Sequence, residues 1–152
     1  MIRWKQPRDD KGIVDLVRTQ LVPISPWQHP RDRRLHNEIT RRLRKGATLV
    51  IAQSRRSVPL AFLQMEFRYK ILFINLLAVH SQYQNRQWGT ELMKRAEQHG
   101  RKKGCTMARV YVDDNNTRAL RFYQRNGYYI VRLLPELRFI ELAKSLADEG
   151  WN

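Results

Sequence analysis

The sequence is poor in cysteine, with the single residue Cys105 among 152. One cysteine cannot form an internal disulfide. Because the four histidines form no cluster with it along the chain, the usual ligand pattern of a structural zinc site is also missing. We therefore expect no bound metal.

Long apolar runs are missing as well. Residues 1–5 lack the hydrophobic core of a signal peptide, and no run approaches the roughly 20 residues that a membrane span requires. We expect a cytoplasmic protein with no membrane contact. A chain of 152 residues has the size of one domain, and we expect that domain to cover residues 1–147 and a frayed tail to cover 148–152.

Acidic residues are scarce: 14 Asp and Glu stand against 29 Lys and Arg, a net charge of +15. Such a surface attracts polyanions, including nucleic acid, ribosomes and acidic small molecules. It also disfavours a highly cationic substrate such as a polyamine. An arginine-rich surface that is simply solvated explains the same composition.

What the chain does contain is an apolar run over residues 71–79, interrupted only by Asn75, followed by a polar turn and a helical pattern that begins near Trp88 or Gly89. This pattern predicts a buried strand feeding a helix. The first N–H groups of such a helix point at the turn, where phosphate is a favoured ligand. Arg86 adds a positive charge there, and Gly89 allows a close backbone approach. An ordinary strand-turn-helix connection has the same pattern.

A second segment narrows these alternatives. Asn116 is a good N-cap, and Gly127 is a typical helix stop. Together the two segments resemble the GNAT acetyltransferase superfamily, which has a Q/R-x-x-G-x-G/A turn after its fourth strand and a later N-x-x-A-x-x-F-Y-x-x-x-G-F/Y segment. The later segment matches at six positions: Asn116, Ala119, Phe122, Tyr123, Gly127 and Tyr128. In the turn, Gln84 and Gly89 fit, but Gln87 stands where the first glycine is expected.

The resemblance implies an α/β fold with a mixed, mostly antiparallel sheet of six or seven strands, flanked by about four helices and splayed at the fourth and fifth strands. The hydrophobic patterns agree with it. They predict strands over 2–5, 48–52, 59–65, 71–79, 107–112, 128–134 and 137–142, and helices that begin near 9–10, after His29, near Trp88 and at Thr117.

The resemblance also implies acetyl-coenzyme A as co-substrate, with its pantetheine arm in the splayed gap and its pyrophosphate on the N–H groups of residues 85–90. The cofactor-binding residues would be Leu77, Ala78, Val79, Gln84, Asn85, Arg86, Gln87, Trp88, Gly89, Thr90, Asn116 and Tyr123. Because a helical backbone tolerates a side chain at Gln87, we expect a weaker or reshaped contact there.

Tyr123 would act as the catalytic residue that protonates the departing thiolate, although it could instead only pack on the sheet. The glutamate positions of many relatives are occupied by Asn75 and Tyr111, which are not bases and which we place in the substrate site. Nearby ionisable groups are Glu66, His80, Asp113 and Asp114, and a water chain or a neutral amine would remove the need for a base. Cys105 is interpreted as a packed core residue and not as an acetyl carrier.

Residues 23–30 would help to form the acceptor pocket. Trp27 is a candidate substrate-binding residue there, whereas His29 is expected to pack the loop. Trp151 is available for the contact of a possible homodimer.

The resemblance implies N-acetyl transfer to a primary amine, in a small molecule or a peptide, by direct attack in a ternary complex. One alternative is a non-catalytic protein that binds coenzyme A. Another is a basic nucleic-acid-associated or ribosome-associated protein that uses one face of the second helix. That face lacks interleaved aromatic residues, which favours the interpretation that it is only a solvated face. It carries Arg31, Arg33, Arg34, Arg41, Arg42, Arg44 and Lys45.

Overall fold

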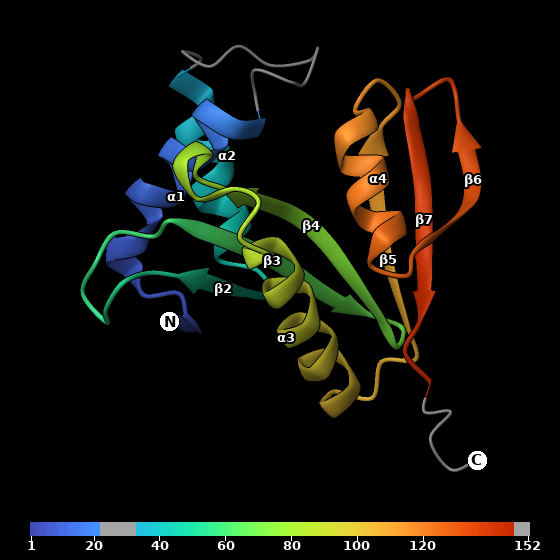
Figure 1. The fold of residues 1–152 in the computed structure, drawn as a ribbon, viewed down its shortest axis with the longest axis horizontal. Coiled ribbons are helices and arrows are strands. Elements are labelled where there is room, and N and C mark those ends of the chain that lie inside the picture. The colour runs from blue at the N-terminus through green and yellow to red at the C-terminus, as the bar shows by residue number, and fades with distance from the viewer. Residues whose placement is uncertain (22–32, 148–152) are drawn as a thin grey trace.

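Seven strands form one sheet in the computed structural model, which describes residues 1–21 and 33–147 (Figure 1). The strands are β1 (Ile2–Trp4), β2 (Ala47–Ile51), β3 (Ala61–Arg68), β4 (Ile71–Val79), β5 (Met107–Asp113), β6 (Tyr129–Leu134) and β7 (Phe139–Ser145). The helices are α1 (Asp10–Leu16), α2 (Arg33–Leu43), α3 (Trp88–Lys102) and α4 (Thr117–Arg125), with short turns η1 (Pro7–Asp9), η2 (Val17–Leu21, a π-helix) and η3 (Ser81–Tyr83). The sequence-predicted tail 148–152, with Trp151, and the loop residues Trp27 and His29 lie outside the described residues.

The strand order is β1-β2-β3-β4-β5-β7-β6, and every neighbouring pair is antiparallel except β4 and β5. That pair is parallel because α3 carries the chain back across the sheet between the two strands. They pair only over Ile71–Ile74 and Met107–Val110, and beyond these residues they part (Figure 1). The predicted mixed sheet with a splay between its fourth and fifth strands is therefore confirmed.

A β-bulge lies where the splay begins. The partners of neighbouring β3 residues jump from Leu76 to Ile74, so Asn75 is the extra residue on β4. A bulge bends its strand and increases its twist. The one polar interruption in the apolar run thus marks the point at which β4 turns away from β5.

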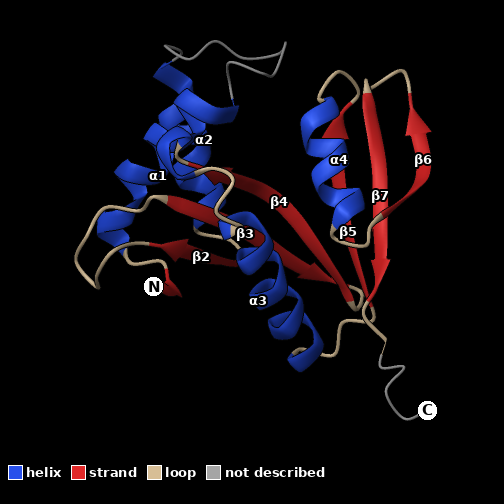
Figure 2. Ribbon diagram, viewed as in Figure 1, coloured by secondary structure: helices blue, strands red, loops and turns tan. Residues whose placement is uncertain are grey.

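Helices cover both faces of the sheet (Figure 2). On one face, α3 and α4 contribute to a core with alternate strand residues such as Leu63, Leu72 and Val110. On the other face, α1 and α2 pack on the intervening residues, among them Phe62 and Ala78. Cys105 is buried in the first core, as predicted, and burial raises the pKa of its thiol.

The last strand begins later than predicted, at Phe139 instead of Leu137, and continues to Ser145. The reason is the turn that precedes it: the N–H of Leu137 donates to the carbonyl of Leu134, and Arg138 adopts a left-handed φ of 61°. Leu137 and Arg138, which the sequence pattern assigned to the strand, instead belong to the turn that reverses the chain.

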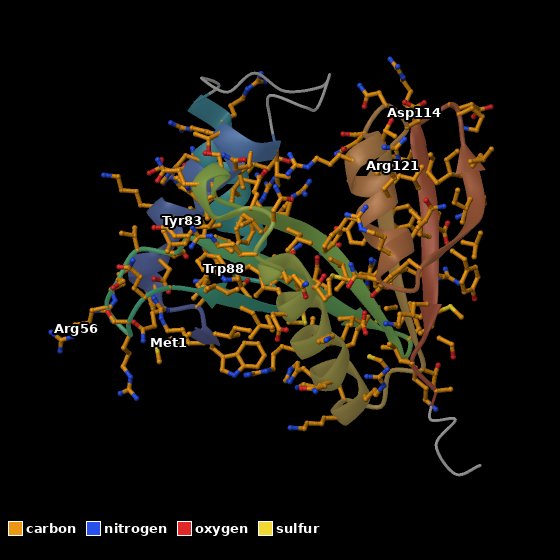
Figure 3. All side chains as sticks on the ribbon, viewed as in Figure 1. Met1, Arg56, Tyr83, Trp88, Asp114 and Arg121 are labelled. Carbon is orange, nitrogen blue, oxygen red and sulfur yellow. The ribbon has the colours of Figure 1, made fainter. Side chains whose placement is uncertain are left out.

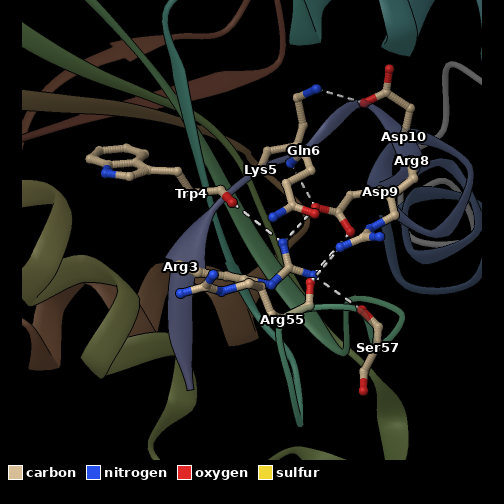
Figure 4. A network of polar contacts seen from close by, with 9 residues as sticks. All are labelled: Arg3, Trp4, Lys5, Gln6, Arg8, Asp9, Asp10, Arg55 and Ser57. Carbon is tan, nitrogen blue, oxygen red and sulfur yellow. Dashed lines mark hydrogen bonds and ion pairs between the residues drawn. The ribbon is translucent and has the colours of Figure 1, made fainter.

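A polar network attaches β1 to the start of α1 (Figure 4). The Arg3 guanidinium donates to both carboxylate oxygens of buried Asp9, at 2.7 and 3.1 Å. Asp9 also accepts from the backbone N–H of Gln6 at 2.7 Å. Burial acts to raise the pKa of Asp9, but these hydrogen bonds outweigh it and hold the pKa below its ordinary value.

A second network joins the two halves of the sheet. The Tyr128 hydroxyl donates to Glu97 of α3 at 2.9 Å, and Lys144 of β7 donates to the other carboxylate oxygen of Glu97 at 2.8 Å. This carboxylate is buried but paired, which is how a domain tolerates a charge in its interior.

In the described part of the chain, no helix is long and apolar enough to cross a membrane.

Candidate active site

A cleft of about 660 Å³ opens where β4 and β5 part. Its walls come from η2 and α2 on one side and from β5, α4 and the turn between β6 and β7 on the other. The predicted site residues that line it are Asn75, Leu77, Tyr111, Asn116 and Tyr123. Segments far apart in the sequence thus meet around one cavity, which has the size of a site for a small molecule.

The backbone of β4 faces this gap at alternate residues. The N–H of His80 donates to Leu60 at 2.8 Å, so the even-numbered residues, including Ala78, direct their backbone groups to β3. Leu77 and Val79 direct theirs towards the parted β5. Of the three strand residues predicted to hold the pantetheine arm, these two have the required orientation.

Gln84 fixes the turn that follows β4. Its amide nitrogen donates to the carbonyl of Val79 at 3.1 Å and to Gln20 of η2 at 3.0 Å, and its amide oxygen accepts from Arg118 of α4. The side chain therefore joins η2, the end of β4 and α4. In this structure the glutamine of the turn motif holds the walls of the cleft in place.

The backbone at Gln87 differs from the prediction. A helical conformation was expected, but Gln87 is the N-cap of α3 and is left-handed, with φ 63° and ψ 18°. That prediction is wrong because the chain must reverse direction immediately before the helix, and a positive φ achieves the reversal. Asn85 is left-handed as well, with φ 63°. The glycine that the motif calls for at position 87 is the residue that suits this conformation best.

The start of α3 presents bare N–H groups to the turn. The side chain of Gln87 makes no cap hydrogen bond, and the first backbone bond of the helix is the one from Glu91 to Gln87. Within the described residues, the N–H groups of Trp88, Gly89 and Thr90 have no partner. Free N–H groups at the positive end of a 15-residue helix make this turn a candidate anion-binding site.

Aromatic stacking orders the same turn. Tyr83 and Trp88 lie near the start of α3 (Figure 3). Their rings stack with centroids 4.9 Å apart. The Arg86 guanidinium carbon lies 5.1 Å from the centre of the Tyr83 ring. A cation–π contact of this kind holds the Arg86 charge beside the helix start. At Gly89, an added Cβ would lie 3.0 Å from two atoms of the Phe122 ring, so the glycine also allows α4 to approach α3.

Tyr123 is 7% exposed and lines the cleft from α4. Its ring packs edge-on against Phe122 and Tyr128, and among the described residues its hydroxyl has no hydrogen-bond partner. Burial raises the pKa of Tyr123 well above its ordinary value, so the hydroxyl keeps its proton at neutral pH. A protonated hydroxyl without a protein partner is free to donate to a group in the cleft.

Asn116 serves as the predicted helix cap: its side-chain oxygen accepts from the N–H of Ala119 at 3.0 Å. The residue also lines the cleft, where its amide nitrogen remains available to a ligand.

The ionisable groups considered as general bases lie at different places in the structure. Asp113 lines the cleft, and burial, assisted by neighbouring Asp114, raises its pKa. His80 caps η3 by accepting from the N–H of Gln82 at 3.1 Å, and Asp114 lies near Arg138. Glu66 accepts a hydrogen bond from the Asn75 amide, so a carboxylate does stand beside position 75, but it comes from β3.

Two further carboxylates line the cleft that sequence reasoning did not single out: Glu38 of α2 and Glu136 of the β6–β7 turn. Their only signal in the sequence is that acids are scarce in this chain. No group of three or more His, Cys, Asp or Glu residues that could hold a metal ion is present in the ranges 1–21 and 33–147.

The basic face of α2 is the other candidate site. Arg41, Arg44 and Lys45 are exposed, whereas Arg42 pairs with Glu38 at 3.2 Å. Within the described residues, the structure brings no aromatic side chain to this face that could stack on a nucleic-acid base. Arg31 lies outside the described residues.

Comparison with known proteins supports the first candidate site, the cleft between β4 and β5. The family model described as acetyltransferase (GNAT) family matches residues 12–128. A relative in Bacillus subtilis (strain 168), the uncharacterised protein YxbD, is 28% identical over 74 residues, which are 49% of this chain and 45% of that protein. The chain thus matches less than half the length of this curated relative.

Solved structures share the fold along nearly the whole chain. An aminoglycoside 6′-acetyltransferase type Ii is similar with a TM-score of 0.81, 19% identity and 99% of each chain covered. The PaiA N-acetyltransferase of Thermoplasma acidophilum, solved with coenzyme A, has a TM-score of 0.78 and 19% identity, with 95% of this chain and 98% of that one covered.

The ribosomal-protein-S18-alanine N-acetyltransferase of Escherichia coli has a TM-score of 0.75 and 16% identity, and the comparison covers 100% of this chain and 97% of that one. At these identities the likeness concerns the fold, whereas the family model spans most of the chain and includes both the turn before α3 and the segment around Tyr123. The chain belongs to the GNAT family of acetyltransferases.

Proposed function

We propose that this protein transfers the acetyl group of acetyl-coenzyme A to a primary amine by direct attack in a ternary complex. The observation that carries the proposal is the cleft between the parted strands. It brings the unpartnered hydroxyl of Tyr123 together with the gap-facing backbone of Leu77, and Val79 follows on the same edge of β4. The family and the coenzyme A complexes of similar folds support the acetyl donor.

The residues present fit this donor. Peptide-like amides of the pantetheine arm would pair with the backbone groups of Leu77 and Val79, whose own strand partner has moved away. The pyrophosphate would rest on the N–H groups of Trp88, Gly89 and Thr90, with Arg86 adding its charge. Because Gln87 reaches the left-handed conformation that the motif's glycine provides, the turn keeps its shape without that glycine.

Tyr123 supplies the acid in the proposed reaction. When the amine nitrogen attacks the thioester carbonyl, the carbon–sulfur bond breaks and a thiolate leaves. The raised pKa of Tyr123 keeps a proton on its oxygen until that moment. A neutral tyrosine is a weak acid in water, but a buried thiolate has a raised affinity for protons, which brings the two groups closer in pKa.

The amine must lose a proton as well. An amine that arrives neutral has already lost it to solvent and needs no base in the protein. The proposed mechanism therefore does not require a glutamate at Asn75 or Tyr111.

The test measures release of free thiol from acetyl-coenzyme A with a panel of primary amines. For Tyr123→Phe we expect kcat to fall by about 100-fold or more, the usual contribution of a general acid, with the Kd for coenzyme A unchanged. The substitution should leave the melting temperature unchanged, because the hydroxyl has no hydrogen-bond partner in the described structure and the ring is retained.

Full turnover by Tyr123→Phe would remove Tyr123 from this role. Binding of coenzyme A without thiol release for any amine would favour the non-catalytic alternative. No binding at millimolar coenzyme A would contradict the proposal as a whole.

A further inference from the structure

The charge of the cleft is opposite to the charge of the chain. Lys and Arg outnumber Asp and Glu 29 to 14, about two to one. Among the described residues that line the cleft, the ratio is reversed: Arg42 is the one cation in that set, against Glu38, Asp113 and Glu136. A cleft lined in proportion to the composition of the chain would carry a positive net charge. The net charge of the described lining is therefore opposite in sign to that of the whole chain.

The two walls contribute differently. On α2, Glu38 and Arg42 pair at 3.2 Å, so their charges cancel to a large extent. On the opposite wall, neither Asp113 nor Glu136 forms an ion pair within the described ranges. The neighbouring cation, Arg138, has its Nε 3.8 Å from the Asp114 carboxylate, and its charge also acts on Asp113. With Asp113, Asp114 and Glu136 against Arg138, the described wall built by the end of β5 and the β6–β7 turn is negative.

The same wall has the other features that an organic cation uses. Tyr111 lines the cleft and is 42% exposed as a residue, and an aromatic face attracts an ammonium group. Phe139 and Leu137 also line it and offer apolar contact to a hydrocarbon spacer. Asp113 is partly buried, so its interaction with a cation is screened less than that of a fully exposed carboxylate.

We infer that the acceptor amine carries a second positive charge, separated by an aliphatic spacer, and that Asp113 and Glu136 bind this second charge. The inference rests on the proposed function, because it assigns a substrate class to the same cleft. The reacting amine must be neutral when it attacks, whereas the distal ammonium or guanidinium stays charged and can be recognised. The net charge of the whole chain disfavours such a substrate, but the cleft wall determines what binds there.

The experiment compares 1,4-diaminobutane with n-butylamine, which has the same spacer length but lacks the second charge. We expect kcat/KM to be about tenfold or more higher for the diamine, as one charged hydrogen bond provides. In Asp113→Asn and Glu136→Gln, KM for the diamine should rise by about the same factor, with little change for n-butylamine at Glu136→Gln. Asp15→Asn, an exposed acid of α1 that does not line the cleft, is the control with the same change in charge.

Binding of the diamine to the coenzyme A-loaded protein, measured by calorimetry, gives a readout that does not depend on turnover. If the diamine binds and Glu136→Gln weakens its binding, but no thiol is released, the inference stands and the proposed transfer fails. If both amines are acetylated with equal kcat/KM, or if Glu136→Gln and Asp15→Asn behave alike, the transfer stands and the inference is overturned.

Discussion

Replacing Gln87 by glycine should stabilise this protein, although the replacement removes a side chain. The residue is left-handed, with φ 63° and ψ 18°, and this region costs a residue with a Cβ about 1–2 kcal/mol relative to glycine. Glycine in turn has a more flexible unfolded chain, which costs about 0.5–1 kcal/mol. Because Gln87 is exposed and makes no cap hydrogen bond, little else is lost. The net expectation is a gain of about 0.5 kcal/mol in the free energy of unfolding.

The same variant tests the proposed phosphate site. Bare backbone at position 87 leaves more room above the N–H groups of Trp88 and Gly89, so Gln87→Gly should bind coenzyme A at least as tightly as the parent. Gln87→Ala is the matched control, because it removes the side chain beyond Cβ but keeps the strain, and its stability should stay near that of the parent. Urea unfolding and calorimetry measure the two effects.

Two results would refute this reasoning. If Gln87→Gly were less stable than the parent, the left-handed backbone would not carry the strain assigned to it. If the alanine variant gained as much stability as the glycine variant, the gain would come from loss of the side chain and not from relief of the backbone.

Two further predictions concern packing and pH. Gly89→Ala should lower the free energy of unfolding by about 1 kcal/mol, because the new Cβ would meet the Phe122 ring at 3.0 Å. In urea unfolding, adding Phe122→Leu to this variant should relieve part of the loss. If the effects of the two substitutions were strictly additive, the result would contradict the contact. Asp9→Asn should cost about 3–5 kcal/mol at pH 7 by leaving the buried Arg3 charge unpaired. Since the pKa of Asp9 is lowered in the folded protein, the stabilisation is present above about pH 4 and is lost as the pH falls through that lowered value. The difference between parent and variant should therefore shrink in unfolding experiments towards pH 3; a constant difference would contradict the assignment.

Most of the fold could be predicted because its signals are local. The apolar run over 71–79 became β4, the helix expected near Trp88 begins there, and Asn116 caps α4 through its own side chain. Gly127 follows α4 with a positive φ of 93°, as a helix stop does. Each of these features depends on residues within a few positions of one another, which is the range that periodicity and capping rules cover.

The walls of the cleft could not be predicted in this way. Glu38, Asp113 and Glu136 come from three separate elements, and only the folded sheet brings them to one cavity. The left-handed backbone at Gln87 was also missed, because the glutamine gives no local signal for a positive φ; only its place in the motif suggests one. The bulge at Asn75 is a third case, since a polar residue in an apolar strand predicts equally well a buried polar group or an irregularity.

The two ends of the site carry opposite charges, and this arrangement suits the two substrates of the proposed reaction. The turn before α3 is positive, through Arg86 and the free N–H groups of the helix start, whereas the β5 wall is negative, through Asp113 and Glu136. Coenzyme A is a polyanion, so the net charge of +15 attracts it from a distance. The second charge of a diamine is attracted only within the range of the cleft carboxylates, which is about 8 Å at physiological salt. In the proposed reaction each substrate would thereby be drawn to its own end, and the thioester and the amine would meet between them, where Tyr123 lies. A basic surface and an acidic acceptor wall are therefore compatible within one enzyme, because they act on different molecules over different distances.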